Sequence, residues 1–103
     1  MTQLHAMKLV NIVANIMLED QMVAIAEAHA ASGYTVLKAR GAGSAGLQTG
    51  ALDGGSNILF MLIVPEDKLD AVMLAVEKLM KRGHHLTAFI TDTQVMRREK
   101  FTS

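Results

Sequence analysis

The sequence contains no cysteine, no tryptophan and a single proline among its 103 residues. Without cysteine the chain can form neither a disulfide framework nor a thiolate site, which is compatible with a reducing compartment. Ten basic residues balance ten acidic ones, so the positive excess that favours binding to a nucleic acid backbone is missing. No apolar run is long enough to cross a bilayer, and the N-terminal segment lacks the pattern of a signal peptide. We therefore expect a cytoplasmic protein that neither spans a membrane nor binds nucleic acid.

Aliphatic side chains, in contrast, are abundant. Hydrophobic residues make up 50% of the chain, although aromatic residues make up only 4%. The length predicts one domain over residues 1–103, and a domain of this size offers too few buried positions for so much apolar surface. The surplus favours a homo-oligomer, in which another copy covers part of that surface.

The hydrophobic pattern predicts strands over residues 7–18, 34–40, 57–64 and 85–93, with one helix after the first strand and one after the third. Acidic residues open both helices, and Gly33 and Gly83 are expected to end them with a positive φ. The order βαββαβ is typical of an α+β ferredoxin-like sandwich, with two helices on one face of an antiparallel four-stranded sheet. The run "NILFMLIV" at 57–64 predicts burial on both faces, so we expect other subunits to cover the open face of the sheet.

Six of the eight glycines fall between Gly41 and Gly55. A plain interpretation is a connection between two strands that does not pack. Small residues at Gly41, Gly43 and Ser44 also allow backbone amides to form an anion-binding nest, and Arg40 precedes it directly. We expect residues 42–56 to form a loop that orders on a ligand or a partner.

Two basic segments lie outside this loop. The turn "KRGHH" at 81–85 either caps the second helix or forms a reduced phosphate-binding turn that includes His85, and both interpretations stay open. Adjacent histidines rarely share one metal ion without further ligands, so we expect no metal. Arg97 and Arg98 are either solvated charges on a short tail or a forked clamp for phosphate. The sequence has no paired carboxylates in a cleft-forming context, no Ser-His-Asp pattern and no complete Walker loop, so we expect no catalytic residues and no enzyme.

The segment "GYTVLKARGAG" resembles the second strand of PII signalling proteins, in which a Gly-x-Thr-Val start precedes a Gly-x-Gly at the root of a long loop. The segment "VPEDKLDAV" resembles the third-strand exit and second-helix start of the same family. The resemblance covers about residues 7 to 98. The continuation into Gly-x-Gly-Ser is closer to the PII-like proteins associated with carboxysomes and bicarbonate transporters.

The resemblance implies a homotrimer that acts as a sensor, with adenine nucleotide bound in clefts between subunits. It places Val13 under the base, Gly33 and Thr35 beside the adenine, and the backbone of Gly41 and Gly43 near the phosphates. It brings Arg97 and Arg98 from a neighbouring chain. With the nest and the basic turn, the nucleotide-binding residues we expect are Val13, Gly33, Thr35, Arg40, Gly41, Gly43, Ser44, His85, Arg97 and Arg98.

Departures from the family pattern narrow the range of ligands that we expect. The loop is shorter than in nitrogen-regulatory members and has no tyrosine to uridylylate, and Ser44 and Ala45 stand where those members carry a glutamine. These differences favour ADP or AMP over ATP and argue against 2-oxoglutarate sensing. By analogy the protein senses bicarbonate in inorganic-carbon metabolism, and its 42–56 loop docks on a transporter or a carboxysome-related target. The alternatives are a metal-binding or structural trimer related to copper-tolerance proteins, and a ligand-free adaptor of a membrane transporter.

Overall fold

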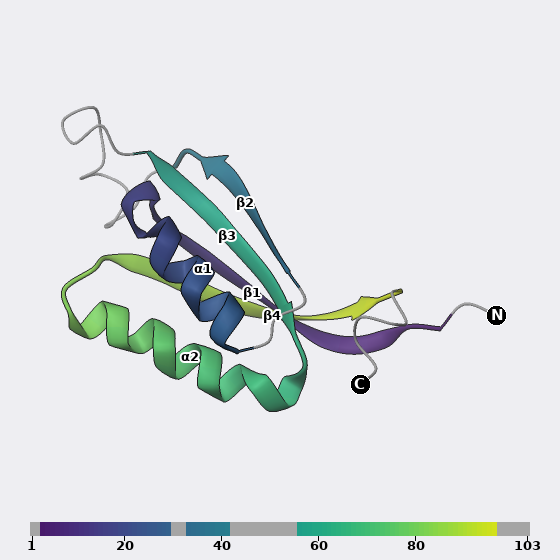
Figure 1. The fold of residues 1–103 in the computed structure, drawn as a ribbon. Coiled ribbons are helices and arrows are strands. Elements are labelled where there is room, and N and C mark those ends of the chain that lie inside the picture. Colours follow the sequence, from purple (N-terminus) through teal and green to yellow (C-terminus); the bar gives the residue numbers. More distant parts are fainter. Residues whose placement is uncertain (1–2, 30–32, 42–55, 97–103) are drawn as a thin grey trace.

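The computed structural model describes residues 3–29, 33–41 and 56–96. These residues form one four-stranded sheet with two helices and one short 3₁₀ turn, η1. The elements are β1 (His5–Asn15), η1 (Ile16–Leu18), α1 (Glu19–Ala28), β2 (Tyr34–Ala39), β3 (Asn57–Val64), α2 (Glu66–Lys81) and β4 (Leu86–Val95). The strand order is β2-β3-β1-β4 with antiparallel pairs throughout, and both helices cover one face (Figure 1). The predicted ferredoxin-like βαββαβ sandwich is confirmed.

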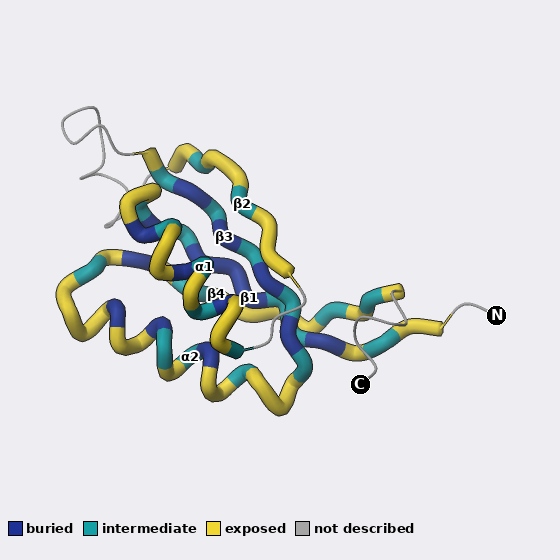
Figure 2. The backbone as a smooth tube through the Cα atoms, in the orientation of Figure 1, coloured by how far each residue is buried: buried dark blue, intermediate teal, exposed yellow. Residues whose placement is uncertain are grey.

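The core lies between the helices and the central strands β1 and β3. Alternate residues of these strands are buried against the helices because successive side chains point to opposite faces of a sheet. Figure 2 shows this burial along the middle of β1 and β3. The core includes Val10, Ile12, Ala14, Ile58, Phe60, Leu62 and Val64 from the strands and Met22, Ala26, Val72, Val76 and Leu79 from the helices.

The opposite face of the sheet, which we call the open face, is only partly covered. The β3 residues on this face are half-buried, whereas their neighbours on the helix face are buried. Leu37 on β2 and Phe89 on β4 also lie on the open face, and their exposed fractions are 49% and 47%. In a single chain, β3 is therefore fully buried only on the face that packs against the helices, and the predicted burial of its other face is not met. Within the described residues, no second layer of helices or strands covers the other side.

Several predicted boundaries differ from the structure, and two of them differ by three residues or more. The first strand ends at Asn15, because the Asn15 side chain accepts a hydrogen bond from Met17 N at 2.8 Å and turns the chain into η1. Helix α1 ends at Ala28, and Gly33 has no positive φ, so Gly33 is not its cap. Gly83 does have a φ of 96° and follows α2 as predicted.

Candidate functional site

Several predicted residues gather at one end of the sheet. The register pairs Ala39 with Asn57 and Asn57 with Asn15, so β2 and β1 end where β3 begins. Strand β4 begins at the same end, because Leu86 pairs with Ala14. We call this the loop-root end, since the chain leaves it at Gly41 and returns at Ser56 (Figure 1). A hydrogen bond of 2.7 Å from Ile16 N to Ser56 O joins the return point to η1.

Arg40 and Gly41 follow β2 and are exposed. Apart from the chain neighbours of Gly41, no heavy atom of the described residues lies within 4 Å of the point where a Cβ on Gly41 would stand. The backbone there is open to an approaching group, as an anion-binding amide must be. The arrangement is compatible with a phosphate contact at this root.

Val13 and Thr35 lie on the open face, on β1 and β2. Val13 pairs with Leu59 and Thr35 with Met61, so β3 separates the two predicted residues. Two strand spacings amount to about 10 Å, and the two side chains therefore do not meet within one chain. Gly33, directly before β2, is exposed, and within the part of the chain that the structure describes no heavy atom beyond its chain neighbours lies within 4 Å of the point where a Cβ on it would stand.

His85 lies at the loop-root end but beside the other edge strand. The sheet order places β2 and β4 at opposite edges, three spacings or about 14 Å apart. Arg40 and His85 of one chain therefore lie at opposite edges of this end of the sheet. Gly43, Ser44, Arg97 and Arg98 lie outside the described residues. Met96, directly before Arg97, follows β4 at the end opposite the loop root, since β4 has ten residues and spans about 33 Å.

The turn after α2 uses its backbone to close the helix. The amides of Arg82, Gly83 and His84 all donate to carbonyls of the last helical turn, at 2.9 to 3.2 Å. Three consecutive N–H groups are thus occupied and not directed at a ligand, which favours the capping interpretation of the turn's backbone. The side chain of His85 is exposed and available to an anion.

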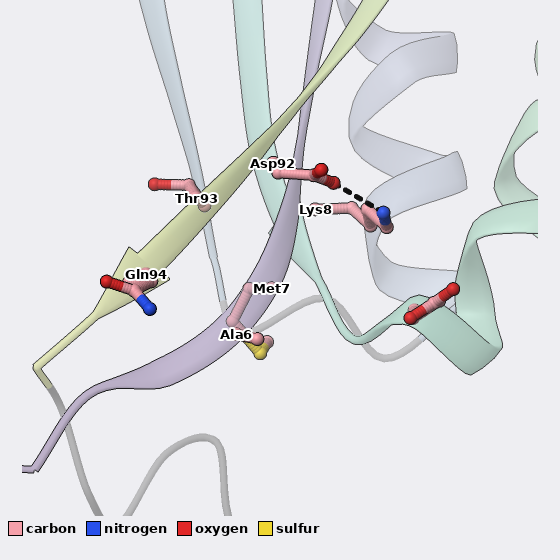
Figure 3. Close-up of a pocket in the computed structure, with 7 residues that line it drawn as sticks. Ala6, Met7, Lys8, Asp92, Thr93 and Gln94 are labelled. Carbon is pink, nitrogen blue, oxygen red and sulfur yellow. Dashed lines mark hydrogen bonds and ion pairs between the residues drawn. The ribbon is translucent and has the colours of Figure 1, made fainter.

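A pocket of about 600 Å³ lies elsewhere, near the other end of the sheet. Its lining includes an ion pair between Lys8 on β1 and Asp92 on β4, with an Nζ–Oδ1 distance of 2.5 Å (Figure 3). The hydrogen bond from Lys8 to Asp92 raises the pKa of Lys8, and the charges of Asp92 and Glu66 act in the same direction, against partial desolvation. The lining residues are Ala6, Met7, Lys8, Glu66, Asp92, Thr93 and Gln94.

Of the predicted nucleotide-binding residues that the structure describes, none lines this pocket. Lys8 and Asp92 lie 84 residues apart in sequence, and only the pairing of β1 with β4 brings them together. No local pattern signals such a pair. No group of three or more potential metal ligands occurs within residues 3–29, 33–41 and 56–96, and no helix of this part of the chain is long and apolar enough to cross a membrane.

The topology defines a ferredoxin-like sandwich whose loop root lies at one end of the sheet. The chain belongs to the PII family, because the family model for nitrogen regulatory protein P-II matches residues 7–100. Proteins of this family are regulatory and are typically trimers with small-molecule effectors. The resemblance predicted from the sequence is confirmed.

Solved structures agree with this assignment. A PII-like signalling protein from Thermus thermophilus is 31% identical, with a TM-score of 0.79, covering 97% of this chain and 99% of that one. CPII from Thiomonas intermedia, bound to ADP and bicarbonate, has a TM-score of 0.84 at 23% identity and covers 99% of this chain and 100% of its own. A second CPII structure, bound to ADP, AMP and bicarbonate, has a TM-score of 0.82 at 22% identity, covering 98% of each chain. No curated protein matches the sequence significantly.

Proposed function

We propose that this protein is a PII-like regulator that binds ADP or AMP between the subunits of a homotrimer. The observation that carries the proposal is the position of Arg40 and Gly41 at one edge of the loop-root end and of His85 at the other edge. Because three strand spacings separate these groups within one chain, the proposal has Arg40 and Gly41 of one chain and His85 of its neighbour contact the same nucleotide. The open face, with its partly exposed apolar residues, supplies a surface for such an assembly.

Each predicted residue has a physical role in this site. Val13 offers an apolar contact to the base, and the backbone at Gly33 and the hydroxyl of Thr35 offer hydrogen bonds beside it. The Arg40 guanidinium and the backbone amides from Gly41 onward suit a phosphate, which prefers charge-assisted donors. Gly43 and Ser44 extend the nest, and the neighbouring chain adds His85, Arg97 and Arg98.

In this proposal residues 1–103 form one domain and residues 42–56 transmit ligand occupancy. The loop adopts one arrangement with nucleotide bound and another without it, and a protein target distinguishes the two. The relatives with ADP, AMP and bicarbonate support these three ligands as the effectors. We further propose a bicarbonate transporter or a carboxysome-related protein as the target.

The decisive experiment is calorimetry with ATP, ADP, AMP and cyclic AMP, each with and without bicarbonate. We expect binding of ADP or AMP with a stoichiometry of one per chain, because a threefold assembly has three equivalent clefts. Absence of binding for all four nucleotides would contradict the proposal. Target capture that ignores nucleotide would favour the adaptor alternative.

A matched pair of variants locates the site. Arg40→Gln removes the proposed phosphate contact, and Lys38→Gln removes the same charge two residues earlier on β2. Loss of a hydrogen bond to a charged group weakens binding by about tenfold to a hundredfold, so Arg40→Gln should raise the Kd for ADP by that factor. Lys38→Gln should change it little. Equal effects of the two variants would show only general charge attraction.

A further inference from the structure

The two helices begin at opposite ends of the sheet. Helix α1 begins beside the loop root, whereas α2 begins where β3 ends (Figure 1). The eight residues of β3, or about 25 Å, lie between the loop root and the start of α2. In other respects the two helix starts are alike, since both carry two acids in the first turn and neither has a side-chain cap within the described residues. The feature that sets α1 apart is the 3₁₀ turn η1, which connects it directly to β1.

Backbone hydrogen bonds join η1 to the loop return point on one side and to α1 on the other. Ile16 N donates to Ser56 O at 2.7 Å, one residue beyond the last β1–β3 pair, Asn15 with Asn57. Ile16 O accepts a hydrogen bond from the amide of Glu19, the first residue of α1. The same residue therefore bonds both to the point where the chain returns to the sheet and to the start of a helix.

The rest of η1 is held as firmly. Met17 N donates to the Asn15 side chain at 2.8 Å. Leu18 is 5% exposed and packs in the same core cluster as Met22 of α1. Each residue from the end of β1 to the start of α1 is thus fixed by a hydrogen bond or by the core. A change in position at the return point therefore reaches the first turn of α1 instead of being absorbed by a flexible connection.

We propose that Ile16 is a positioning residue through which the ligand state of the loop root is transmitted to the first turn of α1. This inference rests on the proposed function, because the ligand is the proposed nucleotide. Coupling between two sites is reciprocal in free energy. If bound nucleotide makes the bond between Ile16 and Ser56 open less often, the bond lowers the Kd for nucleotide by the same factor, since the return point is already ordered before binding.

Amide hydrogen exchange of the wild type, with and without ADP, tests the transmission. Glu19 N and Lys68 N form a matched pair, because each donates to the carbonyl three residues earlier at a helix start, Glu19 to Ile16 O and Lys68 to Pro65 O. ADP should slow exchange at Ile16 and Glu19 about fivefold or more and leave Lys68 unchanged. Equal slowing at Glu19 and Lys68 would mean that ADP stabilises the whole fold, and it would overturn the inference.

Two substitutions at one position test the bond itself. Ile16→Pro removes the N–H that bonds to Ser56, and proline suits this place because it favours the first position of a helical turn and Asn15 before it has a ψ of 145°. Ile16→Ala keeps the N–H and shortens the side chain. Ile16→Pro should raise the Kd for ADP about fivefold and abolish the effect of ADP on Glu19 exchange, whereas Ile16→Ala should behave as the wild type does.

The outcomes separate this inference from the proposed function. Calorimetry gives the Kd values, and circular dichroism shows whether each variant folds. If Ile16→Pro does not fold, the exchange of Glu19 and Lys68 in the wild type decides by itself. A wild type that binds ADP, with both variants binding it equally well, overturns the inference and leaves the proposed function standing. A wild type that binds none of the nucleotides overturns the proposed function.

Discussion

The hydrogen bond from Met17 N to the Asn15 side chain holds the turn beside the loop root, and Asn15→Ala removes it. In the structure this bond is 2.8 Å long, and the preceding amide, Ile16 N, donates to Ser56 O at 2.7 Å. The substitution leaves the Met17 amide without its side-chain acceptor at the start of η1. Residue 16 would then be less well placed to bond to Ser56, where the chain returns from the loop.

The magnitude follows from the type of bond. An asparagine cap replaced by alanine costs about 1 kcal/mol, which corresponds to a fall in Tm of about 4 to 8 °C for a domain of this size. Thermal unfolding followed by circular dichroism measures the change, at equal protein concentrations because an oligomer's Tm depends on concentration. Amide exchange should accelerate at Ile16 and Met17 and change little in the core strand β3.

The matched variant is Asn15→Asp, whose carboxylate can accept the same hydrogen bond. It should retain most of the stability that alanine loses. If Asn15→Ala melts with the wild type, or if the aspartate variant is as unstable as the alanine variant, the turn is not held by this side chain. The account of the loop root would then be wrong.

Two further predictions concern the loop root and the ion pair. Gly41→Ala should unfold like the wild type, since an added Cβ would meet no heavy atom of the described residues within 4 Å, chain neighbours aside, and the φ of Gly41 is not positive. It should nevertheless weaken ADP binding in calorimetry, because the added Cβ hinders the approach of the backbone to a phosphate. Unchanged affinity would place the phosphate elsewhere. Because the bond to Asp92 raises the pKa of Lys8 above its ordinary 10.5, the pair stabilises the folded state below that pH and loses its effect as the pH rises through the folded-state pKa. Urea unfolding of the wild type and Lys8→Gln should therefore converge in strongly alkaline buffer, and a difference that grows with pH would refute the sign.

The predicted element order held because hydrophobic periodicity and helix-end signals are local properties of the chain. The alternation in β3 and the spacing of Val72, Val76 and Leu79 on α2 show one buried face each, and Gly83 adopts the positive φ that a helix end favours. Gly33 was expected to end a helix with a positive φ for the same reason, but its φ is not positive. A glycine permits a positive φ without requiring it, so neighbouring backbone contacts decide the outcome.

For the candidate site, the sequence by itself indicated residue types: an arginine before two glycines, a threonine on a strand, and histidines after a helix. It also determined the family, since the spacing of those residues along the chain carries the resemblance. Only the tertiary structure decided where they lie. Strand pairing put Arg40 and His85 at one end of the sheet but on opposite edges, and it joined Lys8 to Asp92 across 84 residues. Strand order and register depend on contacts between distant segments. A pattern along the chain could therefore predict the residue types of the site, but only the folded sheet shows where those residues lie.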